Sequence, residues 1–261
     1  MTGLLDRIVA TKREEIAALR GRRLPTPGKV IPAELKRRPG DPLRLIAEIK
    51  RRSPSAGALS TALSVAERAA AYQEAGATMV SVLCDAAFFD GSFEHLAEAR
   101  AACGLPLLCK DFVLDEVQLD FARAFGASAV LLIVRCLTDP ELQRLIAGAR
   151  ERGLLPVVEI TSAAEAERAL ALEADCVGVN ARDLDTLAMD RERAGAVLGA
   201  LPSSLTRAWF SGLKDPAALS DPIYQAADAA LIGEGLMRED DPGPLLRRFV
   251  QTAQTSVASV G

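Results

Sequence analysis

The sequence is poor in the residues that bind transition metals or assist nucleophiles. It has one histidine, His95, and its five cysteines (Cys84, Cys103, Cys109, Cys136 and Cys176) form no CxxC pair. Structural zinc sites need four such ligands, and a Ser-His-Asp triad needs its histidine. We therefore expect no bound metal and no triad. An odd number of cysteines inside apolar runs such as PLLCKDF and DCVGVN is typical of reduced thiols in a cytosolic protein.

Long apolar runs and an excess of basic residues are also absent. The longest strongly apolar run, AVLLIV at 129–134, is too short to cross a bilayer. The N-terminal stretch is broken by charges and lacks the apolar segment of a signal peptide. With 31 Lys and Arg against 35 Asp and Glu, the net charge of −4 gives no general attraction for nucleic acid or anionic membranes. We expect a cytoplasmic globular protein with a small-molecule partner.

Strand-like and helix-like segments alternate regularly along the chain. Eight short apolar runs have the composition of buried strands: LIAEI (45–49), MVSVL (79–83), LPLLC (105–109), AVLLIV (129–134), PVVEI (156–160), CVGVN (176–180), RAWFS (207–211) and AALIG (229–233). Alanine-rich, charged segments such as SVAERAAAYQEAGA lie between them and have helical character. The alternation predicts an α/β protein with a buried parallel sheet. We favour a (β/α)8 TIM barrel over a doubly wound open sheet, because no GxGxxG turn follows the first strand.

The stretch before the first strand predicts a helical extension of the barrel. Its apolar residues recur at roughly helical spacing at Leu5, Ile8, Val9, Ile16 and Leu19, and a Pro/Gly-rich connector, RRLPTPGKVIPAELKRRPGDP, follows. We expect one domain over residues 1–261, with the N-terminal helical extension at 1–44, the barrel at 45–250 and a C-terminal tail at 251–261.

Charged and amide side chains interrupt the strands at their carboxyl-terminal ends, where a barrel carries its active site. Glu48 and Lys50 are two residues apart, so both point to the barrel interior. The third, fifth and sixth strands end with Lys110, Glu159 and Asn180, and Arg182 follows. In a partly desolvated pocket a lysine can act as a general acid and a carboxylate as a base. A structural ion pair is the alternative for Glu48 and Lys50.

Glycine-bearing turns follow the last two strands, at Ser211-Gly212 and at Gly233-Glu234-Gly235. In phosphate-binding barrels these two loops present backbone N–H groups to the phosphate, although plain turn glycines are the alternative. The loop RRSPSAG adds the hydroxyl of Ser53 and small residues suited to a mobile lid. Phe88, Phe89 and Phe112 follow the second and third strands, where they either sandwich a flat aromatic substrate or fill the barrel rim.

These motifs together resemble the indole-3-glycerol phosphate synthase family. The resemblance covers nearly the whole chain through IAEIKRRSPS, SVLCDAAFFDGS, KDFVLDEVQL, VLLIVRCL, VVEI, VGVNARDLDTL and LIGEGLMREDDP. It implies a carboxy-lyase of tryptophan biosynthesis that needs neither a metal nor an organic cofactor. Such an enzyme converts 1-(2-carboxyphenylamino)-1-deoxyribulose 5-phosphate into indole-3-glycerol phosphate, carbon dioxide and water. The chain is then expected to be a monomer or a weak homodimer.

The resemblance also implies roles for individual residues. Lys110 would polarise the substrate ketone, and Glu159 would be the acid and base of the dehydration. Glu48 and Asn180 would hold hydroxyls and support the charge network, and Lys50 would pair with charged groups of the substrate. Arg182 would contact the anthranilate carboxylate, and Phe89, Phe112 and Leu131 would contact its ring. The phosphate would be bound by Ser53, Ser211, Gly212, Gly233 and the Glu234 backbone. Phe210 and Leu231 are also expected to contact the substrate.

The chain departs from the family pattern just before Ser211-Gly212. The family has a glutamate there, in a hydrophobic-Ala-Glu-Ser-Gly pattern, whereas this chain reads AWFSG with Phe210 in its place. Two smaller departures, Cys84 and Asp90, are also expected to touch the pocket. The alternatives are a paralogue acting on a related arylamino sugar phosphate and a non-catalytic phosphate-ligand binder. The isomerase of the same pathway is disfavoured because its Cys/Asp pair has no counterpart here.

Overall fold

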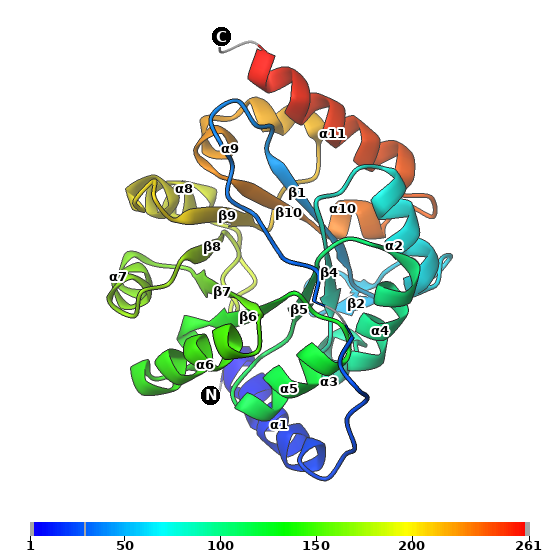
Figure 1. Ribbon diagram of the computed structural model, residues 1–261. Coiled ribbons are helices and arrows are strands. Elements are labelled where there is room, and N and C mark those ends of the chain that lie inside the picture. The colour runs from blue at the N-terminus through cyan, green and yellow to red at the C-terminus, as the bar shows by residue number, and fades with distance from the viewer. Residues whose placement is uncertain (1–2, 29, 259–261) are drawn as a thin grey trace.

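The computed structural model describes residues 3–28 and 30–258, and its centre is a closed barrel of eight parallel strands (Figure 1). Around the barrel the strands follow the order β1 (Arg44–Ile49), β10 (Ala229–Ile232), β9 (Thr206–Phe210), β8 (Cys176–Asn180), β7 (Leu155–Ile160), β6 (Ala129–Ile133), β5 (Leu107–Lys110) and β4 (Met79–Leu83). The predicted (β/α)8 barrel is therefore confirmed. β4 and β8 match the predicted runs, and β5 begins only after Pro106.

Helices surround the barrel and connect its strands (Figure 1). They are α2 (Val65–Glu74), α3 (Ala86–Phe89), α4 (Phe93–Ala102), α5 (Glu116–Ala124), α6 (Asp139–Glu151), α7 (Ala163–Ala171), α8 (Arg191–Ala200), α9 (Pro222–Ala226), α10 (Glu234–Met237) and α11 (Gly243–Ala258), with 3₁₀ turns η1 (Val134–Cys136) and η2 (Pro216–Ser220). Local sequence determines where several of these helices begin. At the start of α2, for example, Ser64 and Glu67 form a capping box. α11 runs across the expected boundary at residue 250, so residues 251–258 are helical.

Side chains alternate along each strand between the layer under the helices and the barrel interior, and this alternation decides where the polar residues point. Ala47 and Ile49 of β1 pack outward against the helices, whereas Ile46 belongs to the cluster inside the barrel. Because side chains alternate along a strand, Glu48 points to the same interior as Ile46, and Lys50 continues this side just past the strand end. The first strand thus delivers two charges to the barrel mouth, as the sequence predicted.

The N-terminal extension reaches both ends of the barrel. Its helix α1 (Leu4–Leu19) lies against the carboxyl-terminal strand ends, where the Leu5 N–H binds Asp185 at 3.0 Å. The connector then reaches the opposite end, where Lys36 Nζ donates to the carbonyls of Ser203 and Leu205 just before β9. In the described part of the chain, no helix is long and apolar enough to span a membrane.

Candidate active site

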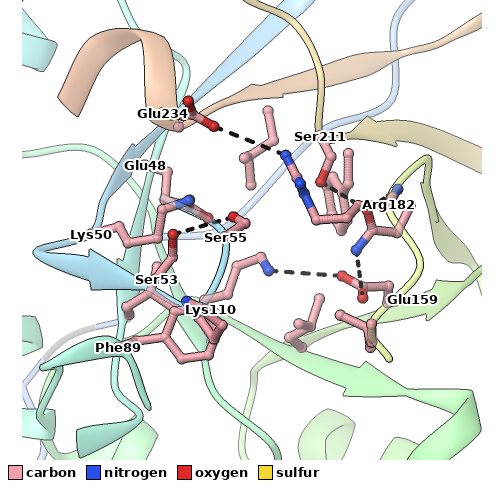
Figure 2. A pocket seen from close by; sticks show the side chains of 18 of the residues that line it. Glu48, Lys50, Ser53, Ser55, Phe89, Lys110, Glu159, Arg182, Ser211 and Glu234 are labelled. Atoms are coloured by element: carbon pink, nitrogen blue, oxygen red, sulfur yellow. Dashed lines mark hydrogen bonds and ion pairs between the residues drawn. The ribbon is translucent and has the colours of Figure 1, made fainter. Parts of the chain in front are cut away.

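A pocket opens at the carboxyl-terminal ends of the strands, and most residues predicted for the site line it. The predicted catalytic and substrate-contact residues in it are Glu48, Lys50, Ser53, Phe89, Lys110, Phe112, Leu131, Glu159, Asn180, Arg182, Phe210, Ser211, Gly212, Leu231, Gly233 and Glu234, whereas Phe88, Cys84 and Asp90 lie outside it. In Figure 2, Lys110 points across the pocket toward Glu159, while Phe89 lies on the side opposite Glu234 and Ser211. The geometry thus brings together residues from strands spread over the whole chain.

Glu48 and Lys50 form a tight ion pair on one side of the pocket. Lys50 Nζ lies 2.6 Å from Glu48 Oε1, and the Glu48 side chain is only 4% exposed. Burial alone raises the pKa of the Glu48 carboxyl, but the charges of Lys50 and Lys110 lower it more, so its pKa lies below the ordinary value of 4.5. Glu48 is therefore held ionised by its neighbours.

Lys110 and Glu159 form a looser pair across the pocket. Their charged atoms are 3.8 Å apart, and Glu159 Oε2 is buried with no hydrogen-bond partner. The other oxygen, Oε1, accepts a hydrogen bond from Asn180 Nδ2 at 3.0 Å, and Asn180 Oδ1 in turn accepts one from Ser211 Oγ at 2.8 Å. This network fixes the carboxylate while leaving one of its oxygens free for a ligand.

Phe210 fills the barrel interior beside this pair. Its ring is 1% exposed and lies where a Cβ on residue 178 would stand, so Gly178 makes room for it. Lys110 Nζ lies 5.8 Å from the ring centroid, within range of a cation–π contact. The aromatic ring is therefore a packed floor under Lys110.

The turns after β9 and β10 form a second, positively charged lobe of the pocket. Ser211 and Gly212 have left-handed backbones, with φ of 71° and 83°, and α10 begins at Glu234 after Gly233. The first N–H groups of a helix have no partner within it, so they are open to an anion. Arg182 and Lys214 also line this lobe, with Glu234 Oε2 3.9 Å from Arg182 and Oε1 3.5 Å from Lys214.

Aromatic rings form the wall on the α1 side. Phe89 and Phe112 have ring centroids 6.1 Å apart and are tilted by 38°. Phe88, which was expected beside them, does not line the pocket and packs against the apolar cluster inside the barrel. Leu4 and Ile8 of α1 complete the apolar side of the pocket. The N-terminal helix is thus part of the site.

The expectation that Cys84 and Asp90 touch the pocket is wrong. Cys84 follows Leu83, which lines the pocket, so alternation turns the thiol outward, where its Sγ lies 3.6 Å from that of Cys109. Asp90 pairs instead with Arg51 at 3.3 Å, outside the pocket. All five cysteines are free, and the described residues contain no group of three or more His, Cys, Asp and Glu that could hold a metal.

Sequence reasoning missed several pocket residues. They are Leu4 and Ile8 of α1, Pro54 and Ser55 beside Ser53, Leu83, Asp111, Ile133, Leu184 and Leu187 after β8, and Leu213 and Lys214 after Gly212. A signal for Lys214 was available, because it follows the predicted phosphate turn by two residues. Nothing local marks Leu4 and Ile8, since an amphipathic pattern shows an apolar face but not what that face covers.

A closed parallel barrel with lysines, carboxylates and glycine turns at its carboxyl-terminal mouth defines the class of barrel enzymes that act on phosphorylated small molecules. Solved structures agree on the fold. A 3-hexulose-6-phosphate synthase matches with a TM-score of 0.64 at 17% identity, covering 80% of this chain and 99% of its own. Thiamine phosphate pyrophosphorylase from Pyrococcus furiosus matches with a TM-score of 0.62 at 15% identity, covering 82% and 96%.

Sequence comparisons give the particular family. Residues 5–249 match the family model for indole-3-glycerol phosphate synthase. An enzyme of that name from an Exiguobacterium species is 38% identical, over 97% of this chain and 98% of its own. The enzyme from a Polaromonas species is 39% identical, over 95% of this chain and 98% of its own. The enzyme from Mycolicibacterium smegmatis is 40% identical, over 92% of this chain and 90% of its own. The chain belongs to the indole-3-glycerol phosphate synthase family.

Proposed function

We propose that this chain converts 1-(2-carboxyphenylamino)-1-deoxyribulose 5-phosphate into indole-3-glycerol phosphate, carbon dioxide and water. Family membership over residues 5–249 supports this reaction. The observation that carries it is the convergence of Lys110 and Glu159 across the pocket, with their charged atoms 3.8 Å apart. An acid and a base that reach the same part of one ligand are what a condensation followed by a dehydration requires.

Lys110 is the proposed acid of the first step. Its ammonium would protonate the ketone oxygen as the ring carbon bearing the carboxylate forms the new carbon–carbon bond. Loss of carbon dioxide then returns the bonding electrons to the ring. The proximity of Lys110 to a packed aromatic floor keeps water away from one side of the ammonium, which strengthens its interaction with a ligand oxygen.

Glu159 is the proposed acid and base of the dehydration. The new hydroxyl must leave as water, and a proton must come off the neighbouring carbon or nitrogen to close the indole double bond. Glu159 Oε2 forms only the 3.8 Å ion pair with Lys110 and has no hydrogen-bond partner among the described residues, so we propose that it makes these transfers. Asn180 holds the other oxygen, and we propose that it and Glu48 also bind substrate hydroxyls.

The remaining lining residues are proposed to bind and orient the substrate. Phosphate would lie against the Ser211-Gly212 and Gly233-Glu234 turns with the Ser53 hydroxyl, and Arg182 and Lys50 would meet the anionic groups. The aromatic ring would lie against Phe89, Phe112 and Leu131, with Leu231 and Phe210 below. Such positioning turns the ring closure into an intramolecular reaction of two aligned groups.

Phe210 does not remove the chemistry that this proposal needs. In the described part of the chain, Glu159 is the one carboxylate within ion-pair distance of Lys110. A carboxylate at position 210 would add a second negative charge beside the same ammonium. We propose that the Lys110–Glu159 pair works here without that third group, over an apolar floor.

The proposal is tested by incubating the purified protein with the authentic substrate and following indole absorbance or fluorescence. Turnover is expected without added metal or cofactor. No product from folded protein at saturating substrate would overturn the proposal.

We further propose that the protein acts in the cytoplasm as a monomer or weak homodimer, without nucleic acid or membrane partners. Sedimentation velocity across a concentration series tests the oligomeric state.

A further inference from the structure

Lys12 of α1 is a buried ammonium that binds two carboxylates of the barrel mouth. Its side chain is 2% exposed, and Nζ lies 2.9 Å from Asp85 and 2.8 Å from Asp111, both of which are 1% exposed. Glu15, on the same helix, also contacts Nζ and is 30% exposed. Burying one cation between two carboxylates is costly unless each charge is compensated, so the three side chains depend on one another.

Asp85 controls the position of Phe89. The carboxylate follows β4, and its Oδ1 accepts a hydrogen bond from the Phe88 N–H at 2.8 Å, which caps the short helix α3. Phe89 is the last residue of α3 and lines the pocket. The Asp85 carboxylate therefore caps the helix that carries this ring into the pocket.

Asp111 controls Phe112 in the same way. Its Oδ1 accepts from the Phe112 N–H at 2.9 Å, and its Oδ2 accepts from Gln118 Nε2 at 3.2 Å. Gln118 Nε2 also donates to the Phe112 carbonyl at 2.9 Å. Both polar groups of the Phe112 backbone are thus tied, directly or through Gln118, to the carboxylate that Lys12 binds.

We propose that Lys12 is a positioning residue of the candidate active site. It links the loops after β4 and β5 through their carboxylates and thereby sets the spacing of the Phe89–Phe112 wall. It also ties that wall to α1, which supplies Ile8 to the same pocket. The inference rests on the proposed function, because the wall is expected to hold the aromatic ring of the substrate.

The test compares Lys12→Met with Arg13→Met, which removes the same charge from an exposed position of the same helix. Lys12→Met is expected to raise KM about tenfold while kcat stays within about threefold, because a displaced aromatic wall weakens binding but leaves Lys110 and Glu159 on their strands. Arg13→Met should leave both constants unchanged. Simple loss of folded protein would instead lower the apparent kcat at constant KM. An unchanged KM in Lys12→Met, or an equal rise in Arg13→Met, would overturn the positioning role.

A charge-balanced variant keeps the test decisive if Lys12→Met folds poorly. Lys12→Met combined with Asp85→Asn removes one charge of each sign, while an amide oxygen at position 85 still accepts from Phe88 and the Asp111 carboxylate still accepts from Phe112 and Gln118. The KM of this variant should remain raised. A return to the original KM would show that the hydrogen bonds from the Phe88 and Phe112 N–H groups position the rings without Lys12. Lys12→Arg, which keeps the charge, should recover part of the lost affinity. Turnover by the unmodified protein is the reference: its absence refutes the proposed function, whereas turnover with these KM values unaffected refutes only the role of Lys12.

Discussion

The pocket contains two lysine–glutamate pairs that differ in how completely they are formed. Lys50 and Glu48, on the first-strand side, are 2.6 Å apart, whereas Lys110 at the end of β5 and Glu159 on β7 are 3.8 Å apart. In both pairs the glutamate is buried and the lysine partly exposed, at 15% and 18%. The contrast therefore lies in distance and hydrogen bonding rather than in burial.

We propose that this difference distinguishes a structural ion pair from a catalytic one. The close pair satisfies its own charges, so it is suited to fixing the barrel mouth and meeting polar groups of the substrate. The open pair is too long for a hydrogen bond between its own charged atoms, and one Glu159 oxygen has no hydrogen-bond partner in the described residues. Catalytic groups that form no hydrogen bond with each other need not break one when a ligand binds, so less of the binding free energy is lost.

The largest effect is expected from removing the cation of the open pair. Lys110→Met should lower kcat by about 10² to 10⁴, the usual scale for a general acid, because no other ammonium lies as close to Glu159. Steady-state kinetics on folded variant, with circular dichroism to verify folding, measures this. A loss smaller than that of Lys50→Met would reverse the assignment of the two pairs.

A slightly smaller loss is expected at the base of the same pair. Glu159→Gln keeps an oxygen that can accept from Asn180 but cannot exchange protons, so kcat should fall by about 10². Substrate affinity should change little, which titration calorimetry with the variant can check. Turnover at the original rate would contradict the role of Glu159 in dehydration.

The aromatic floor beside the open pair is expected to contribute to stability. Phe210→Leu shortens a buried side chain packed over Gly178 and should lower the free energy of unfolding by about 1–3 kcal/mol. Urea denaturation measures the change, and Phe88→Leu, at a half-buried ring outside the pocket, is the matched control. Equal changes at both positions would mean that the floor is not specially packed.

The smallest expected effect is the pH dependence of the close pair. Because the pKa of Glu48 is lower in the folded protein than its ordinary value of 4.5, the ionised carboxylate stabilises the fold above that pH. This contribution is lost as the pH falls through the folded-state pKa. Glu48→Gln should therefore lose less stability than the unmodified protein on acidification below 4.5, as measured by unfolding curves at several pH values. Parallel curves for the two proteins would contradict this account of the pair.

The sequence allowed the barrel and most of its mouth to be predicted for physical reasons. A parallel sheet covered on both faces requires continuous apolar runs, which is why the MVSVL and CVGVN segments mark β4 and β8 at their bounds. Barrel topology brings the strand ends together, so residues such as Lys110 and Glu159 could be grouped without knowing their contacts. The same alternation rule, applied past Leu83, would also have turned Cys84 outward.

Contacts made by α1 could not be predicted in this way. Its spacing identified the apolar face of Leu5 and Ile8, but no local pattern indicates that this face covers the pocket. Nothing in the local pattern distinguishes Lys12 from the other charges of this stretch, and its burial follows only from the docking of the helix onto Asp85 and Asp111. Tertiary docking, rather than helix propensity, decides such positions.

The docking of α1 also bears on how the protein is made. The N–H of Leu5 binds Asp185, which is 180 positions later in the chain, so a nascent chain presents this helix long before its partner exists. At about 5–20 residues per second, synthesis of that stretch takes roughly 10–40 seconds. The pocket stays incomplete for longer still, because the turns after β9 and β10 supply its last lining residues. The first helix thus makes its contact with Asp185 only after residue 185 of 261 has been translated, and the site it helps to form is complete only after Glu234.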